Sequence, residues 1–255
     1  MKLSKKSNKQ PKKIFVYGFH AIENLILLKS HLIFNIFLSR NNESQRSIRI
    51  KSLLNEQKIK ITYFEKEQLN KICDSDKHQG FVAEIANPTF LSEKDISTRL
   101  NNLATSKVLI LDSIQDPRNL GACLRSALAF DFDAVIINKN GSSPINEYVF
   151  KTSVGAILNL NIFYVNNLSR SISLLKEIGY WVLGLDSKEE GSIFSEKFAP
   201  KTAVVLGSEG SGIRKLVKEN CDHLIKIPIS NKLESLNISV AAGIIMYELK
   251  KQHFN

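Results

Sequence analysis

The chain has 255 residues, of which 43% are hydrophobic and 24% are charged, a composition typical of globular proteins with a buried core. The formal net charge of +10 favours a polyanionic partner such as a nucleic acid. No apolar run approaches the roughly 18 residues of a membrane-spanning helix, which indicates a cytoplasmic protein without membrane association. Cys73, Cys123 and Cys221 lie far apart without metal-ligand spacing, so we expect reduced thiols and no metal site.

The first third of the chain predicts a basic arm and a small α/β unit. Residues 1–13 carry six lysines and no acid, which predicts a disordered arm that either neutralises phosphate or only aids solubility. Within residues 14–87, periodicity predicts helices at 19–29, 44–57 and 65–73 and strands at 33–38, 60–64 and 81–85. Residues 88–106 contain Pro88 and many polar side chains, and we expect a linker with a short helix there.

Residues 107–255 alternate short apolar runs with helical patterns. The predicted strands are 108–111, 134–138, 160–165, 180–185, 202–206 and 224–227. The predicted helices are 119–130, 145–154, 168–178, 213–220 and 237–252. Continuous apolar strands between helices indicate a mostly parallel, doubly wound sheet that is buried on both faces.

Ligands of such sheets bind beyond the carboxyl ends of the strands, where three loops stand out. The first loop begins after Leu111, and Asn119 is a suitable helix-start residue within it. Arg125 follows in the second helical turn, where the small residues Gly121 and Ala122 leave room for a ligand beside its guanidinium. An exposed arginine in a surface ion pair is the alternative interpretation.

The second loop, residues 206–214, contains three glycines within six residues, so its backbone can approach a ligand closely or simply form a turn. Its spacing is neither that of a dinucleotide fold nor that of a nucleoside-triphosphate loop. Glu209 would repel a phosphate but suits a cationic or hydroxyl-bearing ligand. The third loop, residues 227–243, offers Ser235 or Asn237 as a helix cap before a face of small residues, which packing alone would also explain.

Together the three loops resemble the SpoU/TrmH branch of the SPOUT methyltransferases. The matching motifs are Asn119-x-Gly-x-x-x-Arg125, Gly207-x-Glu209-Gly-x-Gly, and Ile227-Pro followed by Ser235-Leu-Asn237-x-Ser-x-Ala-x-Gly. The third motif has Asn231 where the family usually has glycine, and asparagine tolerates left-handed backbone well. Upstream, Tyr17-Gly18-Phe19-His20-Ala21 and His78-Gln79-Gly80 resemble the N-terminal domain of the bacterial 23S rRNA guanosine 2′-O-methyltransferase subgroup.

The resemblance implies an α/β fold whose C-terminal SPOUT domain, residues 107–255, has a parallel sheet and a trefoil knot. An L30e-like RNA-binding domain, residues 14–87, would precede it. The expected cofactor is S-adenosyl-L-methionine, bound by Gly207, Ile227 and Leu236, and the expected assembly is a homodimer with shared sites. The expected catalytic residues are Arg125, Asn119, Glu209, Ser235 and Asn237, and the expected RNA contacts are Arg118, His20 and His78.

The resulting hypothesis is 2′-O-methylation of a ribose, of guanosine, in 23S rRNA. Methylation of a tRNA ribose is the alternative within the family, and a non-enzymatic RNA-binding protein is the alternative outside it. Binding alone does not need Arg125, Glu209, Ser235 and Asn237 together. A nucleotide-dependent oxidoreductase is disfavoured because no glycine precedes Gly121 in the loop after the first strand of the C-terminal domain.

Overall fold

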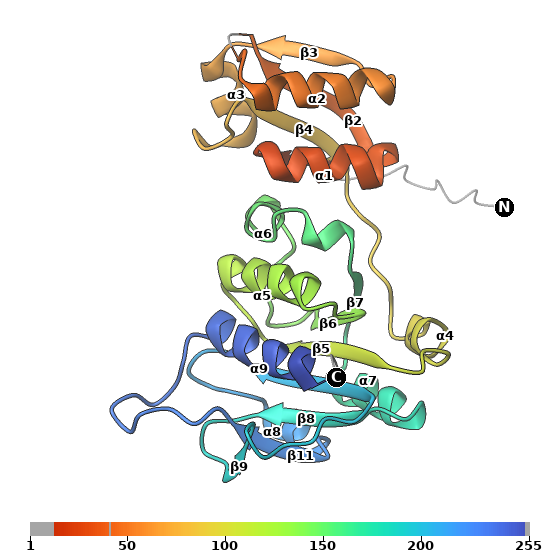
Figure 1. The fold of residues 1–255 in the computed structure, drawn as a ribbon, viewed down its shortest axis with the longest axis vertical. Coiled ribbons are helices and arrows are strands. Elements are labelled where there is room, and N and C mark those ends of the chain that lie inside the picture. Colours follow the sequence, from red (N-terminus) through yellow and green to blue (C-terminus); the bar gives the residue numbers. More distant parts are fainter. Residues whose placement is uncertain (1–12, 41, 253–255) are drawn as a thin grey trace, which may run out of the picture. The chain divides into compact units, whose positions relative to one another are not determined.

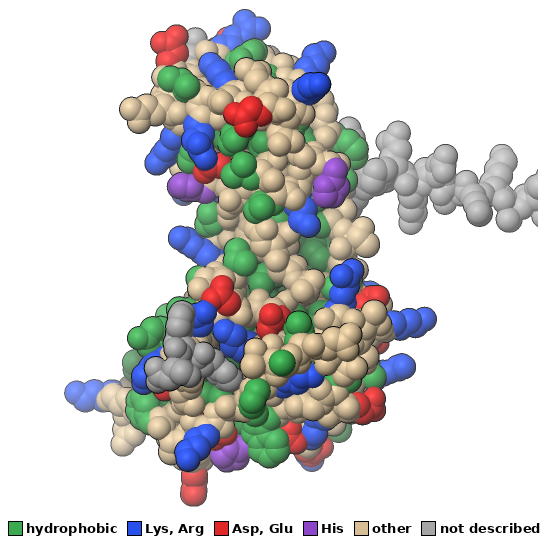
Figure 2. Space-filling model, turned by 45° about the vertical axis from the view of Figure 1, so that its right-hand side comes forward, with side chains coloured by type: hydrophobic (Ala, Val, Ile, Leu, Met, Phe, Trp, Pro, Cys, Tyr) green, Lys and Arg blue, Asp and Glu red, His purple; other side chains and the backbone are tan. Residues whose placement is uncertain are grey.

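The computed structural model describes residues 13–40 and 42–252. The chain divides into two compact units, with the boundary between Thr89 and Phe90. Most of the predicted basic arm, residues 1–12, lies outside the described residues. Lysine and arginine side chains are spread over both units on the face shown in Figure 2.

The first unit is a four-stranded sheet with three α-helices. Its elements are β1 (Lys13–Tyr17), α1 (Phe19–Lys29), η1 (Ser30–Leu32), β2 (Ile33–Ser39), α2 (Gln45–Glu56), β3 (Ile61–Phe64), α3 (Lys66–Cys73) and β4 (Phe81–Ala86). The strand order is β1-β4-β2-β3, and only the β2–β3 pair is parallel. Strand β1 was not predicted from the sequence, because its five residues adjoin the lysine-rich arm and show no alternation of apolar and polar side chains.

The second unit contains a seven-stranded sheet in which every pair is parallel, as predicted. Its strands are β5 (Ser106–Asp112), β6 (Ala134–Asn138), β7 (Asn161–Val165), β8 (Trp181–Leu185), β9 (Gly191–Ser192), β10 (Lys201–Gly207) and β11 (His223–Lys226). Its helices are α4 (Asp95–Leu100), α5 (Pro117–Ala129), α6 (Glu147–Thr152), η2 (Ala156–Leu158), α7 (Leu168–Glu177), α8 (Lys215–Glu219) and α9 (Ile238–Gln252).

Helices cover both faces of this sheet, which explains why its central strands are apolar throughout. Helices α5, α6 and α9 form one layer, and α4, α7 and α8 form the other (Figure 1). In β5, Val108 and Ile110 belong to the core cluster shared with α4 and α7, while Leu109 and Leu111 are equally buried. Alternating side chains of one strand therefore enter two separate hydrophobic layers.

Two sequence expectations need correction here. Helix α5 begins at Pro117 rather than at Asn119, because Asp116 accepts a hydrogen bond from the Arg118 amide at 2.8 Å and proline suits the first helical position. The segment 88–106 does contain the expected short helix, α4, but it is not only a linker, because Ile96 and Leu100 of α4 are fully buried in the core of the second unit.

The strand order is β7-β6-β5-β10-β8-β11-β9, and the chain changes from one half of the sheet to the other at the β5–β10 pair, whose strands remain parallel. The chain leaves β5 toward β6 on one side, whereas β10 arrives later and pairs with β5 on the other side. The connections after β5 and β10 therefore lead to opposite sides of the sheet, toward β6 and β11, and the carboxyl ends of the strands at such a point are the usual ligand position. The first two motif loops lie at this point.

Candidate active site

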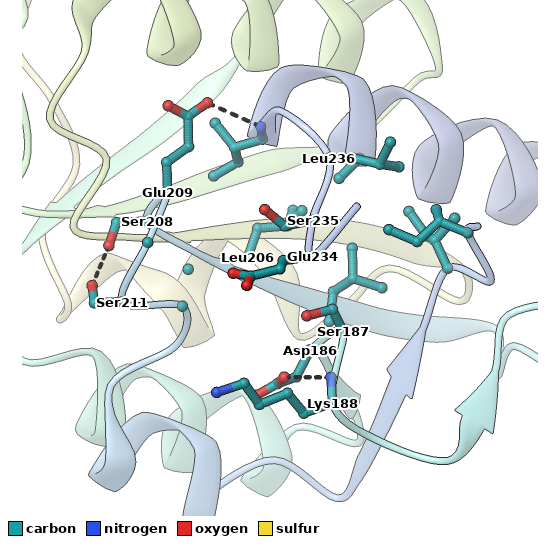
Figure 3. A pocket seen from close by; sticks show the side chains of 18 residues that line it. Asp186, Ser187, Lys188, Leu206, Ser208, Glu209, Ser211, Glu234, Ser235 and Leu236 are labelled. Atoms are coloured by element: carbon teal, nitrogen blue, oxygen red, sulfur yellow. Dashed lines mark hydrogen bonds between the residues drawn. The ribbon is translucent and has the colours of Figure 1, made fainter. Parts of the chain in front are cut away.

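A cavity of about 290 Å³ lies at the carboxyl ends of β8, β10 and β11 (Figure 3). The predicted cofactor residues Gly207, Ile227 and Leu236 all line it. The other lining residues are Leu185, Asp186, Ser187, Lys188, Leu206, Ser208, Glu209, Gly210, Ser211, Gly212, Ile229, Glu234, Ser235, Ile238 and Ala241. The cavity thus combines an apolar wall with charged and hydroxyl groups, as small-molecule sites commonly do.

The second motif loop, called the glycine loop (residues 207–212), forms one edge of the cavity and is closed by two backbone hydrogen bonds. The amides of Ser208 and Gly212 each donate to the other's carbonyl oxygen, at 3.2 and 3.0 Å. A Cβ on Gly207 would lie 1.9 Å from the carbonyl carbon of Gly212, so only glycine fits there. Gly210 and Gly212 have φ values of +90° and +67°, which favour glycine as well.

A buried carboxylate fixes the far end of this loop. Asp112 is fully buried at the end of β5 and accepts hydrogen bonds from the Arg214 amide at 2.9 Å and from its Nε at 2.7 Å. This pair was not predicted from the sequence. The available signal was an aspartate directly after an apolar strand, where a buried charge needs a partner.

One polar cluster joins all three motif loops. Glu209 Oε1 accepts hydrogen bonds from Asn119 Nδ2 at 3.0 Å, from Asn237 Nδ2 at 2.6 Å and from the Ile238 amide at 3.3 Å. Asn237 Nδ2 also lies 3.3 Å from Asn119 Oδ1. Asn237 caps α9 by accepting from the Ser239 amide at 2.9 Å, which fixes the orientation of its side chain. The two asparagines are thus held together around one carboxylate at the rim of the cavity.

Arg125 stands apart from this cluster. It is exposed on α5 and makes no hydrogen bond or ion pair with any residue that the structure describes. The interpretation that Gly121 leaves room for a ligand is wrong, because a Cβ there would lie 2.6 Å from Thr152 Cβ on α6. Gly121 therefore permits close packing of two helices. Arg118 is likewise exposed, and Ser235 lies in the cavity lining.

The two histidines expected to contact RNA have different surroundings. His20 is exposed and stacks edge to face on Phe19. His78 is only 1% exposed, and its Nδ1 accepts from the Gly80 amide at 2.9 Å while Nε2 lies 2.8 Å from Asn70 Oδ1. Burial, assisted by nearby Lys66, lowers the pKa of His78, so the ring is neutral. The expectation that His78 contacts RNA is therefore corrected: its ring supports the turn before β4.

The cysteines offer no nucleophile. Cys123 is fully buried and Cys221 is partly buried, and burial raises the pKa of both thiols to about 12. Among residues 13–40 and 42–252, no three histidine, cysteine or acidic side chains gather as a metal site would require. Within the same ranges, no helix is both long and apolar enough to cross a bilayer.

Comparisons with known proteins match both units. The model of the SpoU rRNA Methylase family matches residues 106–247, and the model described as RNA 2′-O ribose methyltransferase substrate binding matches residues 15–91. Two curated relatives are named 23S rRNA (guanosine-2′-O-)-methyltransferase RlmB. The protein from Coxiella burnetii is 37% identical over 93% of this chain and 95% of its own length, and that from Escherichia coli K12 is 33% identical over 93% and 98%.

Solved structures show the same fold at low sequence identity. The SpoU methyltransferase AviRb from Streptomyces viridochromogenes, in complex with AdoMet, has a TM-score of 0.78 at 19% identity and covers 95% of this chain and 91% of its own. An AdoMet-bound rRNA methyltransferase from Sinorhizobium meliloti has a TM-score of 0.77 at 16% identity, with coverages of 95% and 88%. With two motif loops lining one cavity, the first loop bonded to them through Asn119, and both units matched by family models, the chain belongs to the SpoU rRNA methylase family.

Proposed function

We propose that this protein transfers the methyl group of S-adenosylmethionine to the 2′-hydroxyl of a guanosine in 23S rRNA. The observation that carries the proposal is the cluster of Asn119, Glu209 and Asn237, which joins three motif loops at the rim of a cavity. Relatives that perform this reaction by name align over 93% of the chain, which supports the choice of substrate.

The cavity fits the cofactor in chemistry. Leu206, Ile227, Leu236 and Ile238 offer an apolar surface for an adenine ring, and the glycine loop brings backbone groups to the cavity edge. Gly207, Ile227 and Leu236 would hold the adenosine largely through backbone groups. When bound, S-adenosylmethionine supplies an electrophilic methyl group on a positively charged sulfur, so the reaction needs no metal.

The chain's own residues would then position the ribose. Arg125 is exposed and without a partner among the described residues, so its guanidinium is available to RNA. An arginine remains protonated in proteins, so we assign it to holding a phosphate and the hydroxyl rather than to removing the proton. Glu209 would fix Asn119 and Asn237, and these two with Ser235 would orient the ribose and the cofactor.

We further propose a homodimer in which each site uses residues of both chains. Val240, Ile244 and Tyr247 form an exposed apolar stripe on α9, with side chains 36% to 57% exposed. Their spacing of three and four residues puts them on one helix face. A partner that covers this stripe could also bring its own Arg125 to the cluster. Sedimentation should give a dimer, and a fully active monomer would contradict the shared site.

Finer features of the fold are also part of the proposal. We infer that the C-terminal domain, residues 107–255, contains a trefoil knot and that residues 14–87 are an L30e-like RNA-binding domain. Residues 107–255 would carry the methyl transfer, while Arg118, His20 and the arm would contact RNA. A cytoplasmic location suits a ribosomal RNA substrate.

The test is methyl transfer from labelled S-adenosylmethionine to unmodified 23S rRNA and, in parallel, to unmodified tRNA, followed by nucleoside analysis. A 2′-O-methylguanosine product from rRNA alone would support enzyme, reaction and substrate together. Product from tRNA alone would keep the reaction and reject the substrate. A protein that binds RNA but not the cofactor would be the non-enzymatic alternative.

A further inference from the structure

Acidic side chains outnumber basic ones in the lining of the cavity. Among the residues that the structure describes, Asp186, Glu209 and Glu234 line it together with a single cation, Lys188. Asp186 has partners of its own: its Oδ2 lies 2.9 Å from Lys218 Nζ, which it shares with Glu189, and its Oδ1 accepts from the Lys188 amide at 3.0 Å. Glu209 is committed to the two asparagines of the polar cluster.

Glu234 differs from the other two carboxylates. Its side chain projects into the cavity from the loop before α9 (Figure 3). It makes no hydrogen bond or ion pair with any residue in the described part of the chain. Glu234 therefore presents an uncompensated negative charge to whatever occupies the cavity, and such a charge favours a cationic ligand over a neutral one of the same shape.

Resting on the proposed function, we propose that Glu234 is a specificity-determining residue that makes the cavity prefer the cationic cofactor to its neutral product. In the transfer, the carbon–sulfur bond breaks, its electron pair stays on sulfur, and the methyl group bonds to the ribose oxygen. The hydroxyl proton is released to solvent. The sulfonium thereby becomes the neutral thioether S-adenosylhomocysteine, which loses the attraction to Glu234, so the same charge that favours cofactor binding favours product release.

The test is calorimetric binding of three ligands that share the adenosine and amino-acid groups. S-adenosylmethionine and sinefungin carry a positive charge at the sulfur position, whereas S-adenosylhomocysteine does not. Glu234→Gln keeps the size and an acceptor oxygen but removes the charge. The variant should bind the two cationic ligands about tenfold more weakly and bind S-adenosylhomocysteine as the unmodified protein does.

Glu219→Gln serves as the matched control, since Glu219 lies on α8 outside the lining and pairs with Lys215. It should leave all three affinities unchanged. An equal loss for all three ligands in Glu234→Gln would overturn the proposal and assign Glu234 to a shared group such as the ribose hydroxyls. Unchanged affinities would overturn it too. Failure of the unmodified protein to bind S-adenosylmethionine would instead count against the proposed function.

Discussion

Replacing Gly207 with alanine tests the construction of the glycine loop. The added Cβ would lie 1.9 Å from the carbonyl carbon of Gly212 and 2.1 Å from the Ile213 nitrogen, whereas carbon atoms in contact lie about 3.5–4.0 Å apart. The two backbone segments must separate by more than 1 Å, which breaks both hydrogen bonds between Ser208 and Gly212. Two lost hydrogen bonds and the packing strain together cost about 2–5 kcal/mol.

Thermal unfolding should therefore shift downward by about 5–15 °C, and calorimetry should show weaker binding of S-adenosylmethionine because Glu209 moves with the loop. Glu219→Gln is the control, since Glu219 lies on α8 outside the cavity lining and its ion pair with Lys215 is exposed. If Gly207→Ala unfolded at the original temperature and bound the cofactor unchanged, the close approach inferred at this position would be refuted.

Arg125→Ala should abolish methyl transfer while leaving cofactor affinity and unfolding temperature unchanged, because the side chain has no partner among the described residues; normal turnover would remove Arg125 from the mechanism. Burial lowers the pKa of His78 in the folded protein. As the pH falls below 6.5, the unfolded chain binds a proton at this ring more readily than the folded protein does, so the free energy of unfolding should decrease on acidification. In His78→Gln, denaturant unfolding should show a smaller decrease of the unfolding free energy on acidification. Identical pH profiles for the two proteins would contradict the role given to His78. Deleting residues 1–12, which precede β1, should weaken RNA affinity more at low than at high salt. If the shortened and full chains bind RNA equally at both salt concentrations, the arm does not contribute to RNA binding.

The local pattern of the sequence was sufficient for most elements of the second unit. Apolar runs such as 134–138 coincide with the observed strand because a strand buried on both faces needs apolar residues at every position. Asn237 was recognised as a possible cap, and its side chain does accept from the Ser239 amide. Errors arose where local signals compete, as at the start of α5, where Asp116 rather than Asn119 accepts from the first turn.

The sequence by itself also determined which three loops matter, since each follows a strand and carries unusual residues. It did not determine how their side chains meet, because Asn119, Glu209 and Asn237 are separated by 90 and 28 positions along the chain. The pairing of β10 with β5 brings Asn119 close to Glu209, and the packing of α9 on α5 brings Asn237 to them. Both depend on contacts between segments that are distant in the sequence. The tertiary structure likewise buried His78, paired Asp112 with Arg214 and left Glu234 facing the cavity unpaired, because burial and charge pairing are properties of the assembled core.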